Sequence, residues 1–265
     1  MAEYLIRAGA KAAPMTAREI AANVGTSDAT VVRAAKSLGF ENLRELRQTL
    51  GEFHEADIAS RFNATIGASP GRHLALEDAI LRQIQDLEGL HRRILTTEFD
   101  HACELIASSA VTWWSGTGPS ASLAEYAAFL CRRHGLPSGA LTHAGPDHAD
   151  ELLAVRANHV IVLFAYGRIH RYVRVLLAHA AKVGAQVILV TDVLGPNLKD
   201  PIAVRLNAGR GAPSMFASHG QTVVLIESLV LGAAGADPGR SEAALATLNS
   251  LRHELAGVPI DVDPS

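Results

Sequence analysis

Short polar and basic side chains gather between Ser27 and Arg47, in a spacing that suits contact with nucleic acid. On a helix, Thr30, Arg33 and Ser37 would share one face because residues three or four apart are neighbours. Their hydroxyl and guanidinium groups can donate to base edges, and short side chains allow close approach to a DNA major groove. Three cations, Lys36, Arg44 and Arg47, are expected to reach phosphates. The candidate DNA-binding residues are Ser27, Thr30, Arg33, Ala34, Lys36, Ser37, Arg44 and Arg47.

A second group of residues follows apolar runs in the C-terminal two thirds of the chain. Gly116 and Gly118 come after the run 111–115 and would let backbone N–H groups approach an anion, and Ser120 is expected to cap the next helix and donate a hydrogen bond. Thr191 and Asp192 end another apolar run. The candidate ligand-binding residues are Gly116, Thr117, Gly118, Ser120, Tyr166, Gly167, Arg168, Thr191, Ser218 and His219. For several of these, an ordinary capping or turn role is an equally good interpretation.

The elements that position the first group are predicted by their end signals. Thr16 with Glu19 forms a capping box that starts a helix, and Gly25 is suited to its C-terminal end. Ser27 caps a second helix that is expected to run to Gly39, after a gap of about three residues. This helix, turn and helix form a helix-turn-helix motif. We expect its second helix to bury one face; that face consists of Ala29, Val32, Ala35 and Leu38.

Charge alone does not decide the role of this N-terminal segment. Residues 1–52 carry seven Lys and Arg against six Asp and Glu, so a small helical bundle with solvated charges is the alternative interpretation. Because the motif geometry suits a major groove, we favour DNA binding.

The second group requires a parallel sheet with helices on both faces. Short apolar runs at 111–115, 138–142, 159–164, 186–191 and 203–207 alternate with helical stretches. The helices are expected near 120–134, 147–155, 168–183 and 218–231, with amphipathic helices at 74–95 and 241–255. Turn-forming residues between 55 and 72 indicate a loosened connection. We therefore expect an all-α domain at 1–52, a linker at 53–73 and a five-stranded parallel α/β/α domain at 74–257.

Composition excludes several classes of protein. The 265 residues are 48% hydrophobic and 19% charged, with a net charge of -3 and only two cysteines. This is typical of a globular, reduced, cytoplasmic protein without a disulfide framework, and no segment predicts a signal peptide or membrane span. His143 and His148 match no standard metal spacing, so capping or surface roles are expected for them. We expect no metal, no cofactor and no catalytic residue.

The run from Ser27 to Phe40 resembles the hallmark of the RpiR family of transcription regulators. The residues that carry the resemblance are Ser27, Ala29, Thr30, Val31, Val32, Arg33, Lys36, Leu38, Gly39 and Phe40. The resemblance implies an N-terminal helix-turn-helix followed by a sugar-isomerase-like (SIS, flavodoxin-like) domain. Family members usually have a longer first helix before the position of Thr16, so we expect either a shortened first helix or a start downstream of the natural one.

The SIS resemblance also implies an effector pocket, from which this sequence departs at one loop. Phosphosugar-binding members carry a Ser-x-Ser-Gly-x-Thr pattern after the third strand, whereas residues 164–169 here keep only the glycine. The lost hydroxyls argue against the usual phosphate cradle. Arg168, His170, Arg171 and Arg174 place positive charge there instead, which suits another anion such as a carboxylate, or equally a solvated or subunit-contacting helix face.

These features favour a DNA-binding regulator over two alternatives. Its expected partners are a double-stranded operator, a small anionic metabolite (a sugar phosphate or a carboxylate) and further copies of the chain in a homodimer or homotetramer. The first alternative is a SIS-type isomerase, for which Glu227 or His219 would be the available base. The second is an effector-binding module without DNA function.

Overall fold

The computed structural model describes most of the chain and divides it into two compact units. The described residues are 4–5, 12, 15–38, 40–47, 58–68, 71–166, 169–192, 202–212 and 215–256. The first unit comprises residues 1–89 and 209–221, and the second comprises residues 90–208 and 222–265. The domain boundaries expected from the sequence stay a prediction. Each unit is described by itself.

The helix-turn-helix of the first unit forms by local capping. Helix α2 (Ala17–Val24) begins at the predicted capping box, in which the Thr16 hydroxyl accepts from the Glu19 N–H and the Glu19 carboxylate accepts from the Thr16 N–H at 2.6 Å. It ends at Gly25, whose φ of 70° is left-handed. Helix α3 (Asp28–Ser37) starts at Ser27, which accepts from the Thr30 N–H. The predicted signals at both helices are confirmed.

The buried face of α3 differs from the one predicted. Val31 and Ala35 are fully buried in α3, while Ala29 is exposed and Val32 is 38% exposed. The predicted face was spaced every three residues, which drifts by about 60° at each step around a helix, whereas a spacing of four follows the face more closely. The core cluster consists of Leu5, Ala12, Ile20, Ala21, Val31, Ala35 and Leu46.

The first unit contains two further helices, and only the last four residues of the later helix fall in the second unit. Helix α5 (Ile58–Gly67) lies inside the segment that was expected to be a loosened linker, so that expectation is wrong for these ten residues. Apolar residues recur at every fourth position in α5. This repeat favours a helix, although turn-forming residues lie within and around the segment. Helix α6 (Arg72–Arg93) follows. The Thr65 hydroxyl of α5 accepts from the Phe216 N–H, and Gln83 of α6 donates to Ser218, so both helices are tied to the segment 209–221.

The second unit is built on a five-stranded, wholly parallel sheet in the order β2-β1-β3-β4-β5. The strands are β1 (Val111–Ser115), β2 (Ser138–Leu141), β3 (His159–Phe164), β4 (Gln186–Thr191) and β5 (Val204–Asn207). All five predicted strands are present. The strand order reverses between β1 and β3, and in such sheets ligands bind at the carboxyl ends of the strands beside this point.

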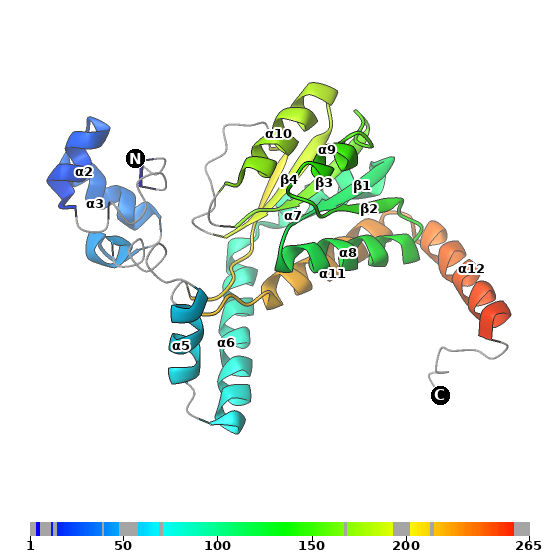
Figure 1. Cartoon of the computed structure of the whole chain (residues 1–265), viewed down its shortest axis with the longest axis horizontal. Coiled ribbons are helices and arrows are strands. Elements are labelled where there is room, and N and C mark those ends of the chain that lie inside the picture. The colour runs from blue at the N-terminus through cyan, green and yellow to red at the C-terminus, as the bar shows by residue number, and fades with distance from the viewer. Residues whose placement is uncertain are drawn as a thin grey trace. The chain divides into compact units, whose positions relative to one another are not determined.

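Helices cover both faces of the sheet (Figure 1). One face carries α9 (Asp147–Leu152) and α10 (Arg171–Val183), whose apolar side chains pack with Ile161, Leu163 and Leu189. The other carries α7 (Thr96–Ser108), α8 (Pro119–Arg133) and α11 (Gly220–Gly235), and Trp114 stacks on Phe164. The chain continues into α12 (Pro238–Ala256). Strand β3 is buried at every position, as expected for a central strand covered on both faces.

Two predicted helix starts require correction. Helix α8 begins at Pro119 with Gly118 as its N-cap, so Ser120 lies within the first turn and is not the cap. Helix α11 begins at Gly220, so Ser218 and His219 precede it. In the described residues no single helix is long and apolar enough to cross a membrane; α11 and α12 satisfy that test only when joined across the 108° bend between them.

Candidate functional site

The outer face of α3 presents the first group of candidate residues. Arg33, Lys36 and Ser37 are exposed, and the Arg33 guanidinium donates to the Thr30 hydroxyl at 3.1 Å. Ser27, the cap of α3, is also exposed. The face therefore combines hydroxyls with two cations on one helix, which is the composition needed to reach base edges and phosphates.

Not every predicted residue lies on this face. Thr30 and Ala34 are half-buried, so less of each side chain is exposed for contact with a ligand than was predicted. Arg44 is exposed in the short helical segment 43–47, whereas Arg47 is half-buried. The exposed Ala29 and Val32 were assigned to the core by sequence reasoning, and they add small apolar contacts of the kind that recognise a thymine methyl group. The four-residue spacing of the buried Val31 and Ala35 is the signal that would have placed Ala29 and Val32 outside the core.

The glycine loop after β1 is built for a close approach of backbone. A Cβ atom at Gly116 would lie 2.6 Å from the carbonyl oxygen of Ser120, so only glycine fits beside the start of α8. Gly118 has φ 58°, in the left-handed region that favours glycine. The hydroxyl of Thr117, between them, donates to the Tyr172 hydroxyl of α10 at 3.0 Å. Ser120 is buried in the first turn of α8.

The other predicted residues of this site are placed less completely. Tyr166 follows β3, and its hydroxyl lies 2.7 Å from that of Thr222. Gly167 and Arg168 lie outside the described residues. Thr191 is buried at the end of β4, and its hydroxyl has no hydrogen-bond partner among the described residues. Ser218 and His219 belong to the first compact unit, so their predicted part in this site stays a prediction.

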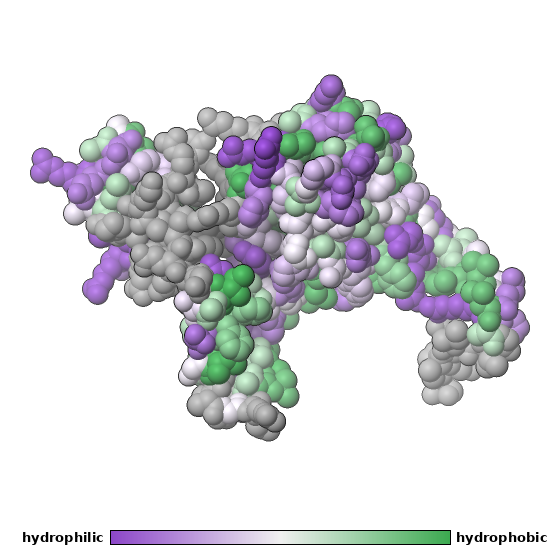
Figure 2. Space-filling view, in the orientation of Figure 1, coloured by the Kyte–Doolittle hydropathy of each residue, from purple (hydrophilic) through white to green (hydrophobic). Residues whose placement is uncertain are grey.

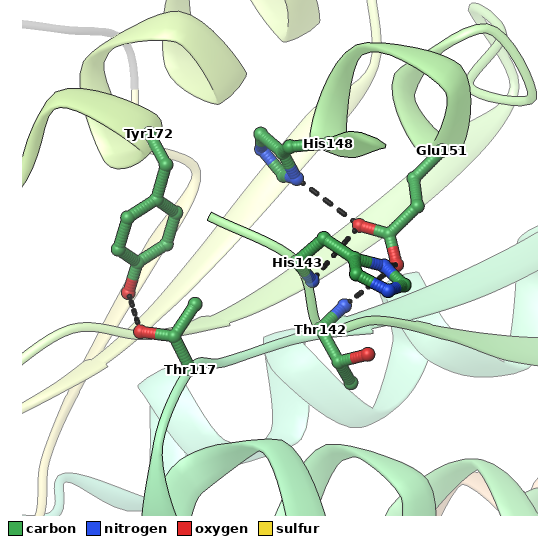
Figure 3. A network of polar contacts seen from close by, with 6 residues as sticks. All are labelled: Thr117, Thr142, His143, His148, Glu151 and Tyr172. Carbon is green, nitrogen blue, oxygen red and sulfur yellow. Dashed lines mark hydrogen bonds and ion pairs between the residues drawn. The ribbon is translucent and has the colours of Figure 1, made fainter. Parts of the chain in front are cut away.

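A polar network that sequence reasoning missed lies at the ends of β1 and β2 (Figure 3). Glu151 of α9 accepts from the backbone N–H groups of Thr142 and His143 and from both the His143 and the His148 rings. His143 is exposed, but His148 is buried at 3% exposure. We call Thr117, Thr142, His143, His148, Glu151 and Tyr172 the strand-end cluster. Capping or surface roles were expected for both histidines, and burial makes a surface role wrong for His148.

The electrostatics of the cluster centre on Glu151. Burial raises the pKa of its carboxyl, but the hydrogen bonds from the Thr142 N–H and the two histidines outweigh burial and leave that pKa below its ordinary value. The hydrogen bond between the His143 ring and the Glu151 carboxylate raises the pKa of His143, and the negative charge of Glu151 raises it further. Glu151 is therefore an anion that orients both imidazoles.

His148 is left with one unused polar atom. Its Nδ1 faces the Glu151 carboxylate at 3.1 Å and must donate to it, so a neutral ring has an acceptor at Nε2. That nitrogen is buried without a hydrogen-bond partner in the described part of the chain, and the ring meets Tyr172 edge-on at 5.8 Å. The Ser115 hydroxyl at the end of β1 is likewise buried without a partner there. Buried unpaired polar atoms are costly, and their presence at one edge of the sheet marks it as the candidate ligand site.

The cluster does not have the arrangement of a metal centre. Among the described residues no group of three or more His, Cys, Asp and Glu side chains could hold a metal ion. Glu227 and His219, the two bases available to an isomerase, do not belong to the strand-end cluster. Glu227 lies two turns into α11 and accepts from the Tyr126 hydroxyl of α8 at 2.7 Å, and burial together with Arg210 lowers the pKa of His219.

Together, the two units define a helix-turn-helix domain joined to a three-layer α/β/α domain with a polar carboxyl edge. Residues 1–55 match the family model described as the helix-turn-helix domain of the rpiR family. The N-terminal segment of this chain is therefore similar to the helix-turn-helix domain of that family. A sequence comparison with curated proteins finds no match.

Two solved structures share the fold of this chain. The sugar isomerase domain of an RpiR transcription factor from Sphaerobacter thermophilus has a TM-score of 0.59 and 21% identity, covering 64% of this chain and 96% of that one. The Vibrio vulnificus NanR protein, solved in complex with ManNAc-6P, has a TM-score of 0.59 and 17% identity, covering 96% of this chain and 92% of that one. These likenesses show that the second unit has the SIS fold, as expected.

Proposed function

We propose that this protein is a cytoplasmic transcription regulator that binds an operator through α3 and a small anionic effector at the carboxyl edge of its SIS domain. The observation that carries the proposal is an rpiR-family helix-turn-helix with an exposed cationic face, on the same chain as a SIS fold. Effector binding would change operator affinity through linkage, because a ligand that favours one conformation shifts the population toward it. A dimer or tetramer would present two such helices to a roughly palindromic site.

DNA binding is tested with the full chain and its own upstream DNA. Fluorescence anisotropy at several salt concentrations should show binding that weakens as salt rises. Arg33→Ala should weaken specific binding by about 10- to 100-fold if the guanidinium contacts a base, whereas Lys36→Ala should reduce the salt slope by about one. Arg92→Ala removes an exposed cation of α6 and serves as the control. Binding that is absent or independent of salt would overturn the proposal.

The effector is proposed to be a small anion that also carries hydroxyl groups. The N-termini of α8 and α10 follow β1 and β3 at the strand-order reversal, where backbone N–H groups and the helix dipoles favour negative charge. Thr117 and Tyr172 contribute a pair of hydroxyls. The His148 nitrogen and the Ser115 hydroxyl, which have no partner among the described residues, suit polar groups of a sugar or hydroxy acid. The NanR protein was solved with a sugar phosphate, which supports the same class of ligand here.

A thermal-shift screen of sugar phosphates against small carboxylates tests the effector class. A true effector should raise the Tm, because a ligand that binds only the folded protein stabilises it. Thr117→Val and Tyr172→Phe should each reduce that rise. Ser138→Ala removes a hydroxyl at the opposite end of β2, where it donates to the Thr112 carbonyl, and should leave the rise unchanged. A rise that survives both edge variants would place the ligand elsewhere.

We also propose that the chain is not an isomerase. Glu227, one of the two available bases, is engaged by Tyr126 on the helical layer, and the usual hydroxyl loop after the third strand is missing from the sequence. Incubation with the sugar phosphates that raise the Tm should give no aldose–ketose interconversion. Turnover that Glu227→Gln abolishes would favour the enzyme instead.

A further inference from the structure

Helix α3 exposes two apolar side chains beside its cations. Ala29 is exposed and Val32 is 38% exposed, whereas Val31 and Ala35 are the residues of α3 that the core buries. Arg33, next to Val32 in the chain, is exposed as well. Figure 2 shows hydrophobic and hydrophilic surface side by side over α2 and α3. The exposed face of α3 therefore offers apolar contact and positive charge at the same place.

Three of these exposed residues form one compact group. Ala29 and Val32 are three positions apart, and Ala29 and Arg33 are four apart, so their side chains are neighbours on the helix surface. At about 100° per residue, Arg33 points directly away from the buried Val31 and Ala35. The group lies in the N-terminal and middle turns of α3, the part of a recognition helix that meets base edges. We call Ala29, Val32 and Arg33 the reading group.

Thr30 is placed to hold the Arg33 guanidinium. Its hydroxyl accepts from Nη2 of Arg33 at 3.1 Å and lies 2.9 Å from the hydroxyl of Ser27, the cap of α3. A bond to a residue three positions earlier directs the guanidinium toward the N-terminal half of the helix. It uses one of the five N–H donors of an arginine, so a two-pronged contact with a base edge can still form. Thr30 is therefore a positioning residue, and Arg33 is the residue that would reach DNA.

We propose that α3 reads a thymine and a neighbouring guanine in the operator, with Ala29 and Val32 against the thymine methyl group and Arg33 on the guanine edge. This inference rests on the proposed function, because it names the bases that the DNA-binding face would select. Small apolar side chains recognise thymine by contact with its methyl group in the major groove. Guanine presents two acceptors there, N7 and O6, which match the fork of an arginine. Lys36, in the last turn of α3, has no fork and is assigned to a phosphate.

Selection from a random library of double-stranded DNA supplies a binding site without knowledge of the natural operator. The full chain should enrich a shared motif in which a thymine stands directly beside a guanine at a fixed position. An enriched motif that lacks this pair would overturn the inference and leave the proposed function intact. If no motif is enriched and binding does not depend on salt, the proposed function fails as well.

Base analogues in the selected site test both contacts with the wild-type protein. Uracil in place of the thymine deletes only the methyl group and should lower the affinity about four-fold, because one methyl group is no longer buried. 7-Deazaguanine in place of the guanine deletes only the N7 acceptor and should lower the affinity about ten-fold, because a hydrogen bond to a charged group is lost. Fluorescence anisotropy measures both changes. Unchanged affinity for either analogue would overturn the proposal.

Variants of α3 assign each contact to a side chain. Val32→Ala should bind the thymine and uracil sites with nearly the same affinity, and Arg33→Ala should no longer distinguish guanine from 7-deazaguanine. Lys36→Ala is the matched control, since it should weaken binding to every site and keep both affinity ratios. Each ratio compares two sites with one protein sample, so partial unfolding of a variant does not alter it. Wild-type ratios in both Val32→Ala and Arg33→Ala would overturn the proposal.

The positioning role of Thr30 has its own readout. Thr30→Val keeps the shape of the side chain but removes the hydroxyl that holds Arg33. It should reduce discrimination between guanine and 7-deazaguanine and leave discrimination between thymine and uracil unchanged. Thr30→Ser retains a hydroxyl and should restore the wild-type ratio. Equal guanine discrimination in wild type and Thr30→Val would show that Arg33 is not held through Thr30.

Discussion

The helix-turn-helix and the SIS domain position their candidate residues in opposite ways. In the first, the caps of α2 and α3 join residues three apart, and the candidate side chains project from one helix. In the second, the candidate site joins residues distant in the chain: Thr117 bonds Tyr172, and Tyr166 bonds Thr222. The surface of a capped helix therefore depends on local sequence, whereas an edge of a parallel sheet depends on the whole domain.

The largest effect is expected from truncating the two cores separately. Leu163→Ala on β3 should lower the unfolding free energy of the SIS domain by about 2–5 kcal/mol, because Leu163 is fully buried. Both tryptophans, Trp113 and Trp114, lie on β1, so their fluorescence reports the unfolding of this domain in denaturant. Ile20→Ala should reduce helix content by circular dichroism and leave the tryptophan transition in place. A shifted tryptophan transition in Ile20→Ala would contradict independent unfolding of the two domains.

A smaller effect is expected from the glycine loop. Gly116→Ala should destabilise the SIS domain by about 1–3 kcal/mol, because the added methyl group would overlap the Ser120 backbone and displace the start of α8. Gly145→Ala is the matched control, since nothing lies within 4 Å of its added Cβ. Tryptophan-monitored denaturation measures both variants. Equal stability of the two would show that α8 adjusts without cost.

The capping box should contribute less, and only to the N-terminal domain. Thr16→Ala should cost that domain about 1 kcal/mol, because it leaves the Glu19 N–H without its side-chain acceptor. Circular dichroism should record the loss as an earlier helical transition. Thr16→Ser keeps the acceptor and should restore the wild-type midpoint. A change in the tryptophan transition would contradict the local role of the cap.

The most local effect is expected from Glu151→Gln, which has a clear signature in pH titration. Removing the carboxylate should lower the pKa of His143 toward its ordinary value, because Glu151 raises it by hydrogen bonding and charge. Nuclear magnetic resonance of the His143 ring measures this shift. Exposed His101, whose Nδ1 lies 3.7 Å from the Glu104 carboxylate, is the internal control, and its ring signals should be the same in wild type and variant. An unchanged His143 titration would contradict the network.

The pH window of this pair follows from the direction of each shift. Because folding raises the pKa of His143, this histidine stabilises the folded protein fully at pH values below its pKa in the unfolded chain. That stabilisation is lost as the pH rises through its pKa in the folded protein. Because folding lowers the pKa of Glu151, this carboxylate stabilises the folded protein fully at pH values above its pKa in the unfolded chain. That stabilisation is lost as the pH falls through its pKa in the folded protein. The stability difference between wild type and Glu151→Gln should therefore be largest at mildly acidic pH and decline on both sides.

Much of the architecture was predictable because its signals are local or periodic. All five strands and the helices between them were expected from apolar runs, and Thr16, Gly25 and Ser27 occupy their predicted capping positions. The buried face of α3 was predicted correctly at Ala35 and Leu38 but wrongly at Ala29 and Val32, because a three-residue spacing was followed and Val31 was missed. Helix α5 was missed because Asn63 and Gly67 resemble loop residues when the four-residue apolar repeat around them is ignored.

The amino-acid sequence by itself determined the two kinds of domain, the capped helices and the presence of glycines after β1. These depend on interactions within a few residues or on a repeating apolar pattern. Only the tertiary structure decided that His148 is buried against Glu151 and Tyr172, that Thr117 meets Tyr172, and that residues 58–67 form a helix, α5. The reason is physical: strand order brings distant loops to one edge, and burial depends on what the rest of the chain covers.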